Sequence, residues 1–253
     1  MSLTTQVSYV GKGEVFLQKR GTAGAKLSPI GNCTSLQFGI TEDKKELLDM
    51  TTGGGGVLDT VSRIKNVTAK MTVSNLSPQN LAIALRGSVT ASTAAAIVDE
   101  AHADIALGSL VELARLPDTG AAITVKVGAT VVASAGNWQA MGAGIWIAPN
   151  ATALVAGDDI TVTYSALADD LVQAMVSGSD EYTLLFQGLN EARSGKPAIV
   201  KAYRIKFSPA KALDLIADDF GQLELEAEAL SDATITGTGL SKFMSVRMGA
   251  QAA

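Results

Sequence analysis

The sequence predicts a mainly β fold with one or two short helices and a small inserted β module. Three observations support this fold class. Apolar and polar residues alternate with a period of two along much of the chain, which is typical of half-buried strands. The chain has 253 residues, enough for one large β domain or two smaller ones. The middle of the chain also differs in charge from its two ends.

The first third of the chain is expected to contain three strands. They cover residues 14–19, 34–40 and 67–73, and the last two have a clear apolar face. Residues 41–60, between the second and third strands, are interpreted as a long loop with a flexible tip of four glycines. Loops of this length are uncommon inside compact domains and often carry function.

The best helix covers residues 77–85. Ser77 suits the N-cap, Pro78 suits the first helical position, and Gly87 is a plausible stop. A second short helix is expected over residues 210–216, directly after Pro209.

The middle block, residues 88–179, is predicted to be an inserted β module between core halves 1–87 and 180–253. It has 2 basic and 9 acidic residues, a net charge of −7, whereas the flanks have +4 and −2. Its expected strands are residues 123–127, 131–133, 144–148 and 158–164. Such a shift in composition indicates a separate module.

The last third returns to longer strands, expected over residues 182–188, 199–207 and 222–230. In the last of these, alternate apolar residues face inward, so Glu224, Glu226 and Glu228 share the outer face. Arg204 and Lys206 on the preceding strand are candidate partners for these carboxylates. One interpretation is a solvated sheet face, and the other is an acidic wall of a water-filled channel that repels a polyanion.

No residue pattern in the sequence favours an enzyme, a metal site or a cofactor. The glycine run lacks the Gly-Lys-Ser/Thr of a phosphate-binding loop. Asp99, Glu100, His102 and Asp104 offer metal-binding atoms, but an ordinary polar turn or helix start explains them better. Cys33 is expected to be a buried or half-buried small side chain.

The order of segments resembles the tail tube (major tail) proteins of tailed bacteriophages. The resemblance is carried by GNCTSLQFGITEDKKELLDMTTGGGGVLDTV, by VTAKMTVSNLSPQNLAIALRG, and by YTLLFQGLNEARSGKPAIVKAYRIKFSPAKALDLIADDFGQLELEAEALSD. NWQAMGAGIWIAPNATALVAGDDITVTYSA looks like a small β module often found in phage structural proteins.

The resemblance implies a β-sandwich or barrel core that forms hexameric rings, stacked into the tube through which the genome is ejected. It implies no cofactor and no membrane insertion. The implied partners are further copies, the tape measure protein, passing DNA, and sheath, baseplate or terminator proteins. The implied location is the virion tail, after synthesis in the cytoplasm of the bacterial host, with the inserted module outside the tube.

The resemblance also assigns roles to two groups of residues. The long loop corresponds to the segment that contacts neighbouring subunits, and Glu224, Glu226 and Glu228 are lumen candidates. The candidate contact residues of the loop are Glu42, Asp43, Lys44, Lys45, Glu46, Gly53, Gly54, Gly55 and Gly56.

Other classes of protein share this composition. A tail terminator or decoration protein would have similar β patterning but would not stack into long tubes. A carbohydrate- or surface-binding module would need aromatic side chains grouped in a groove, and Trp138 and Trp146 lie close enough in sequence to allow one. Burial of both rings in a core is the better interpretation.

Overall fold

The computed structural model describes residues 8–51, 53–176, 178 and 180–249, and it divides into two compact units. Unit 1 comprises Met1–Val89 and Val172–Ala253, and unit 2 is Thr90–Leu171. The predicted module, residues 88–179, contains the whole of unit 2, and its last residue lies outside the described residues. The fold is mainly β, as the alternation of residues predicted.

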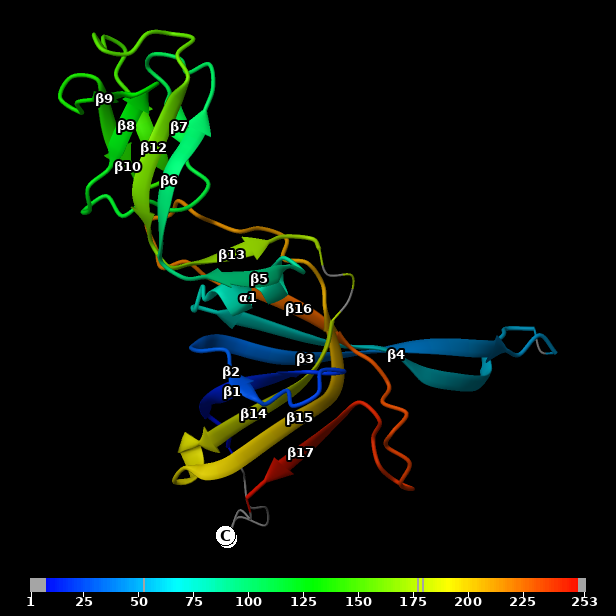
Figure 1. Ribbon diagram of the computed structural model, residues 1–253. Helices are drawn as coiled ribbons and strands as arrows, with labels where there is room; N and C mark the ends of the chain where they lie inside the picture. The colour runs from blue at the N-terminus through cyan, green and yellow to red at the C-terminus, as the bar shows by residue number, and fades with distance from the viewer. Residues whose placement is uncertain (1–7, 52, 177, 179, 250–253) are drawn as a thin grey trace. The chain divides into compact units, whose positions relative to one another are not determined.

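Unit 1 is built on one antiparallel sheet of eight strands (Figure 1). Along its main path the strands follow the order β2 (Ser28–Pro29), β1 (Gly11–Lys19), β14 (Glu181–Asn190), β15 (Lys196–Phe207), β16 (Leu223–Ala229), β4 (Val57–Val73) and β3 (Cys33–Leu48). The eighth strand, β17 (Met244–Met248), also pairs with β15. A short 3₁₀ helix, Glu191–Arg193, joins β14 to β15.

The strand β15 divides this sheet into two parts. Its first half pairs with β17 over Ala198–Ala202, and its last residues, Ile205 to Phe207, pair with β16. The buried side chains of both parts form a single apolar cluster, which includes Val15, Leu184, Ile205, Met71 and Leu225. The two parts of the sheet therefore share one core, whose burial stabilises unit 1.

The predicted helix is present as α1, Pro78–Ala84. The Ser77 hydroxyl accepts a hydrogen bond of 3.3 Å from the Asn80 backbone N–H, which caps the helix. The buried Asn80 side chain donates to the Ile30 carbonyl at 2.8 Å and so ties the helix to the loop after β2. The left-handed residue that ends the helix is Arg86 (φ 48°), not the expected Gly87.

The expected long loop at residues 41–60 is wrong, because β3 and β4 continue through it as a hairpin. Residues 42–46 are all charged and leave no apolar face, so the pattern does not indicate a strand. Both faces of this hairpin are solvated, and neither has to be apolar. Opposite charges stabilise it instead, since Asp43 lies directly opposite Arg63. Thr52, within the turn, is outside the described residues.

The helix expected at residues 210–216 is also absent, and the segment after β15 is irregular. The interpretation of residues 99–104 as a polar turn or helix start is wrong as well. Most of that stretch belongs to β6 (Ala95–His102), which pairs with β12. Local polarity misled the prediction there, because β6 exposes most of its side chains.

Unit 2 is a small β unit with its own core. One sheet has the order β10 (Trp138–Met141), β11 (Gly144–Ile147), β7 (Leu110–Glu112). The other has the order β6, β12 (Ile160–Ala166), β8 (Thr124–Val127), β9 (Thr130–Val132). Their buried residues include Val125, Ile145, Ile147 and Val162.

The chain enters and leaves unit 2 through two strands that pair with each other, β5 (Ser88–Ser92) and β13 (Asp169–Gln173). This pairing brings the two ends of unit 2 close together in space.

Candidate assembly surfaces

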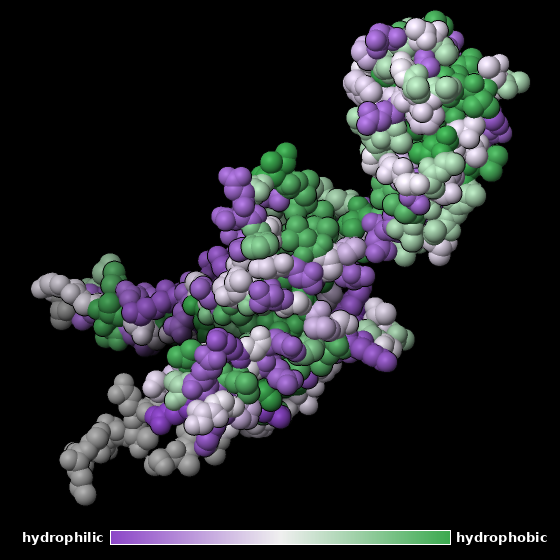
Figure 2. Space-filling model, turned by 90° about the vertical axis from the view of Figure 1, so that its left-hand side faces the viewer, coloured by the Kyte–Doolittle hydropathy of each residue, from purple (hydrophilic) through white to green (hydrophobic). Residues whose placement is uncertain are grey.

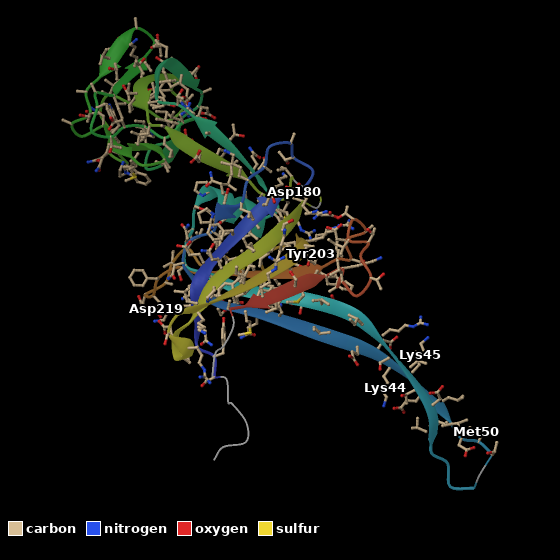
Figure 3. All side chains as sticks on the ribbon, turned by 90° about the horizontal axis from the view of Figure 1, so that it is seen from below. Lys44, Lys45, Met50, Asp180, Tyr203 and Asp219 are labelled. Carbon is tan, nitrogen blue, oxygen red and sulfur yellow. The ribbon has the colours of Figure 1, made fainter. Side chains whose placement is uncertain are left out.

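The hairpin formed by the distal parts of β3 and β4, residues 41–66, is here called the arm. The strand β16 pairs with β4 only over Val67–Val73, so along the arm the described residues contain no third strand. The arm therefore leaves unit 1 as a two-stranded ribbon with two unpaired edges (Figures 1 and 3). Unpaired edges are templates for pairing with another chain.

The charged candidates of the long loop all lie on the arm and are all exposed. They are Glu42, Asp43, Lys44, Lys45 and Glu46. The Lys44 ammonium forms an ion pair of 2.7 Å with Glu46, two residues along the same face. Such exposed pairs contribute little to stability, about 0–1 kcal/mol.

Apolar side chains are interleaved with these charges on the arm (Figure 2). Large apolar side chains on both strands are at least half exposed. Contiguous exposed apolar patches mark interaction sites. The exposed members are Ile40 at the base and then Leu47, Leu48, Met50, Val57, Leu58, Val61 and Ile64. The prediction from sequence did not single them out, because they do not alternate regularly with polar residues along either strand.

The four glycines, Gly53, Gly54, Gly55 and Gly56, form the turn at the end of the arm. Gly54 (φ 139°) and Gly55 (φ 49°) adopt backbone angles that favour glycine. The Asp49 N–H donates to the Gly56 carbonyl at 2.7 Å and closes the turn. The glycines therefore serve the turn geometry of a hairpin.

The three glutamates of β16 lie on its outer face, as the alternation predicts, while Leu223, Leu225, Ala227 and Ala229 are buried. Glu226 forms ion pairs with Lys70 at 3.1 Å and with Lys211 at 3.3 Å. Hydrogen bonds from these lysines lower the pKa of the Glu226 carboxyl.

The outer face of β16 is of mixed charge. Lys206 lies directly opposite Glu228 across the sheet, in addition to the two lysines around Glu226. Lysines thus lie beside Glu226 and Glu228 and offset the repulsion among the carboxylates, whereas Glu224 lies opposite Thr72.

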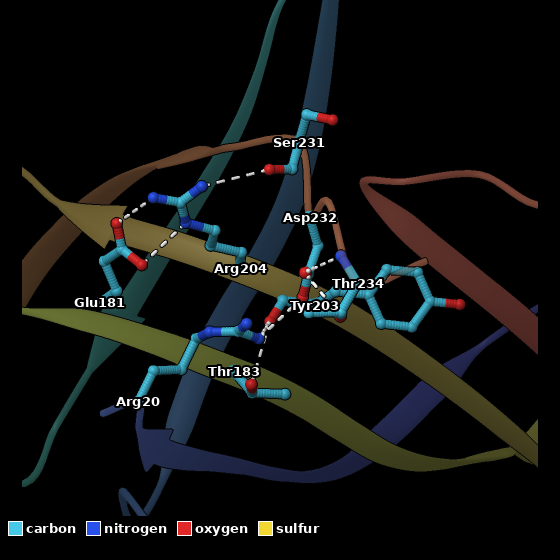
Figure 4. A network of polar contacts seen from close by, with 8 residues as sticks. All are labelled: Arg20, Glu181, Thr183, Tyr203, Arg204, Ser231, Asp232 and Thr234. Carbon is cyan, nitrogen blue, oxygen red and sulfur yellow. Dashed lines mark hydrogen bonds and ion pairs between the residues drawn. The ribbon is translucent and has the colours of Figure 1, made fainter. Parts of the chain in front are cut away.

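Arg204, the other expected partner of these glutamates, instead binds Glu181 through both its Nε and Nη2 (Figure 4). These hydrogen bonds lower the pKa of the Glu181 carboxyl. The second half of the network joins Arg20 to Asp232 at 2.9 Å and to the Tyr203 carbonyl at 2.7 Å. The network fixes the chain that follows β16 onto the ends of β1 and β15.

The residues considered as metal ligands serve structural roles in unit 2. Asp99 pairs with Lys126 at 2.9 Å, and Glu100 accepts hydrogen bonds from the Tyr164 hydroxyl and the Ala114 N–H. Burial, together with Glu100, raises the pKa of Tyr164 to about 12. Within the described part of the chain, no group of three or more His, Cys, Asp or Glu side chains is arranged to hold a metal ion.

The other residues considered from the sequence are Cys33 and the two tryptophans, Trp138 and Trp146. Cys33 is half-buried, as predicted, and burial raises the pKa of its thiol. Trp138 packs against the core of unit 2 and lines a shallow hollow of about 550 Å³ with Ser134 and Gln139. Trp146 lies opposite Gln139 in the sheet, on the other face from Trp138, so the two rings form no common aromatic surface.

The arrangement defines a class of protein, a two-unit antiparallel β protein with a projecting ribbon and extended charged sheet faces. The chain belongs to the family described as Protein of unknown function UCP028589, whose model matches residues 8–247. No curated protein matches the chain. Among the described residues, no helix is both long and apolar enough to cross a membrane.

Proposed function

We propose that this protein is a structural subunit that assembles with copies of itself into stacked hexameric rings, the tail tube of a bacteriophage. The observation that carries the proposal is the arm. Almost every residue of it is exposed, it has two unpaired strand edges, and it displays several large apolar side chains. A two-stranded hairpin is marginally stable in water unless something packs against it.

The energies favour a partner for the arm. Burying one Leu, Val or Met side chain contributes about 1.5–3 kcal/mol, so four of them contribute roughly 6–12 kcal/mol. The loss of translational and rotational freedom on association costs about 4–15 kcal/mol. Apolar burial on this scale, added to backbone pairing at the free edges, accounts for stable contacts between copies.

The details of the tube come from the family resemblance. It supplies the hexameric ring, the stacking, the genome conduit and the partners, which are the tape measure protein and the sheath, baseplate or terminator proteins. The extended polar face of β16 and β4 is the candidate for the lumen wall. This face has mixed charge. Its lysines attract the phosphates of passing DNA, which a purely acidic wall would repel.

The first experiment measures assembly with and without the arm. Residues 42–65 are replaced by Asn-Gly, which closes a two-residue hairpin between Thr41 and Asn66. The full-length chain is expected to form rings and tubes at high concentration, seen by negative-stain microscopy and light scattering. The shortened chain is expected to remain a folded monomer, because the core of unit 1 lies outside the arm.

A matched control carries Val98→Asp and Val131→Asp, two exposed apolar positions of unit 2. It is expected to assemble like the unchanged chain. A full-length chain that stays monomeric at every concentration and salt tested overturns the proposal. Single rings that never stack favour a tail terminator, and particles that add only to a preformed capsid or tail favour a decoration protein.

The lumen assignment is tested separately. Glu224, Glu226 and Glu228 are changed to Lys in the virion. Rings are expected to assemble, because two of these side chains are exposed and the third is partly exposed, but DNA ejection should slow as the wall becomes cationic. An unchanged rate of DNA ejection would show that these residues do not line the lumen.

A further inference from the structure

A small hollow lies on the strands β14, β15 and β17 of unit 1, on the face that points away from the core. Its volume is about 210 Å³. Leu184 on β14 and Ala202 on β15 belong to the buried core, so the residues next to them, Leu185 and Lys201, point to the opposite face. The described residues that line the hollow are Leu185, Ile199, Lys201, Tyr203, Ser245 and Arg247.

The pairing of β15 with β17 brings two cations together in this hollow. Lys201 lies directly opposite Ser245, and Ile199 lies directly opposite Arg247. Lys201 and Arg247 are therefore diagonal neighbours on one face of the sheet, a separation of about 7–8 Å that long side chains can bridge. The Lys201 Nζ is 5.9 Å from the centroid of the Tyr203 ring, which is within the range of a cation–π contact.

Neither cation forms an ion pair with a carboxylate among the described residues, and none of the six lining residues is acidic. The strands β1, β14, β15 and β17 carry two acidic residues, Glu14 and Glu181. Glu14 is separated from Ile199 by Gln187, and Glu181 is held by Arg204. The two positive charges of the hollow therefore repel each other unless water or an anion lies between them.

The chemistry of the lining favours a phosphate monoester as that anion. The guanidinium fork of Arg247 and the ammonium of Lys201 are typical partners of phosphate, and the hydroxyls of Ser245 and Tyr203 offer further donors. A phosphate monoester has three acceptor oxygens and a charge of about −1.5 to −2, which matches two cations. A carboxylate or a backbone phosphodiester has a single negative charge and would leave one cation unmatched.

The apolar part of the lining indicates what is attached to the phosphate. Leu185, Ile199 and the Tyr203 ring offer an apolar surface beside the cations, against which a sugar or a planar base packs. Sites that enclose a whole small molecule have volumes of roughly 300–1,000 Å³, and this hollow is smaller. It therefore fits the phosphate end of a nucleotide, with the remainder of the ligand outside.

We propose that this hollow binds the phosphate monoester of a nucleotide, either a free mononucleotide or the phosphorylated end of a nucleic acid strand. Lys201 and Arg247 bind the phosphate oxygens, Ser245 donates a further hydrogen bond, and the sugar or base packs against Tyr203. The inference does not depend on the proposed self-assembly, because all the lining residues belong to one copy and lie outside the arm.

Isothermal titration calorimetry with the full-length chain tests the site. The probes are adenosine monophosphate, adenosine, inorganic phosphate, and a thymidine hexanucleotide with and without a terminal phosphate monoester. Adenosine monophosphate is expected to bind at least tenfold more tightly than adenosine. Lys201→Gln combined with Arg247→Gln is expected to weaken the binding of adenosine monophosphate at least tenfold. Both side chains are exposed, so the variant should stay folded, which circular dichroism checks.

A matched control removes the same charge elsewhere on unit 1. Lys26→Gln combined with Lys65→Gln changes two exposed lysines that do not line the hollow. This control is expected to change the affinity less than twofold, because exposed charges separated by more than about 8 Å are largely screened at physiological salt. Tyr203→Leu is expected to weaken the binding of adenosine monophosphate more than that of inorganic phosphate, since it removes the ring and keeps both cations.

The outcomes identify the ligand or overturn the site. Tighter binding of the phosphorylated hexanucleotide than of the mononucleotide indicates a strand end, and the reverse order indicates a free nucleotide. No binding of adenosine monophosphate, equal weakening by the two double variants, or binding of the hexanucleotide that ignores its terminal phosphate overturns the site.

The chain in which Asn-Gly replaces residues 42–65 separates this inference from the proposed function. It retains every lining residue of the hollow and is expected to bind adenosine monophosphate as the full-length chain does. Nucleotide binding by a full-length chain that never forms tubes refutes the proposed function alone. Tubes formed by a protein that does not bind the nucleotide refute this inference alone.

Discussion

Arg20 and Asp232 form an ion pair of 2.9 Å in which the carboxylate is only 5% exposed. Asp232 also accepts hydrogen bonds from the N–H and the hydroxyl of Thr234, at 3.0 Å and 2.7 Å. The pair thus joins the end of β1 to the turn that leads from β16 towards β17, two regions far apart in the sequence.

Removing this carboxylate should destabilise unit 1. For Asp232→Ala we expect the free energy of unfolding to fall by about 1–3 kcal/mol, because three polar groups lose their acceptor in a nearly buried site. Urea unfolding followed by circular dichroism measures the change. Lys12→Ala, which breaks the exposed pair with Glu191, is the control and should cost less than about 1 kcal/mol. Equal losses in the two variants would contradict the role assigned to burial.

Stability should fall in acid through the same network. Hydrogen bonds from Thr234 lower the pKa of Asp232, and those from Arg204 lower the pKa of Glu181. A carboxyl whose folded-state pKa is below its unfolded value stabilises the fold above the unfolded pKa, about 4. That contribution is lost as the pH falls from about 5 through the lowered folded-state pKa. Urea midpoints should therefore drop between pH 5 and pH 3, and the drop should be smaller in Asp232→Asn.

In the pairing of β1 with β14, Gly13 lies directly opposite Gly188. A Cβ at Gly13 would lie 2.3 Å from the Gln187 carbonyl oxygen and 2.4 Å from the Gly188 Cα. We expect Gly13→Ala to force these strands apart and to lower stability by about 2 kcal/mol or more. Gly53→Ala, where the added methyl meets no atom within 4 Å, is the control and should change thermal unfolding little.

Unit 2 should be removable without loss of unit 1. The pairing of β5 with β13 brings its entry and exit together, so a short Gly-Ser linker can replace Thr90–Leu171. We expect cooperative unfolding of the remaining chain, because the core of unit 1 contains no residue from unit 2. Loss of cooperative unfolding would show that unit 1 depends on the inserted unit.

The unit 2 fragment offers the converse measurement. Arg115 donates to Asp169 and to the Thr93 and Leu167 carbonyls, and so closes the two ends of the unit. An isolated fragment of residues 88–173 is expected to fold, and Arg115→Ala should destabilise it by about 2–3 kcal/mol. A fragment without a cooperative transition would contradict the independence of its core.

The sequence by itself determined the features that depend on local patterns. The alternation of apolar and polar residues predicted the strands that bury one face, such as β16 and β12. Burial of one face requires an apolar residue at every second position. The Ser77-Pro78 pair predicted α1, since its cap is formed by neighbours in the chain. The charge shift of the middle block indicated a separate module.

Only the tertiary structure decided the rest. The arm lacks a buried face, so its residue pattern does not distinguish a strand from a charged loop. Only the pairing of β3 with β4 shows that it is a hairpin. The helix expected directly after Pro209, over residues 210–216, did not form, because a short helix needs a surface to pack on. Arg204 found Glu181 instead of the β16 glutamates, since the choice of ion-pair partner depends on distances in the folded sheet, which spacing along the chain does not fix.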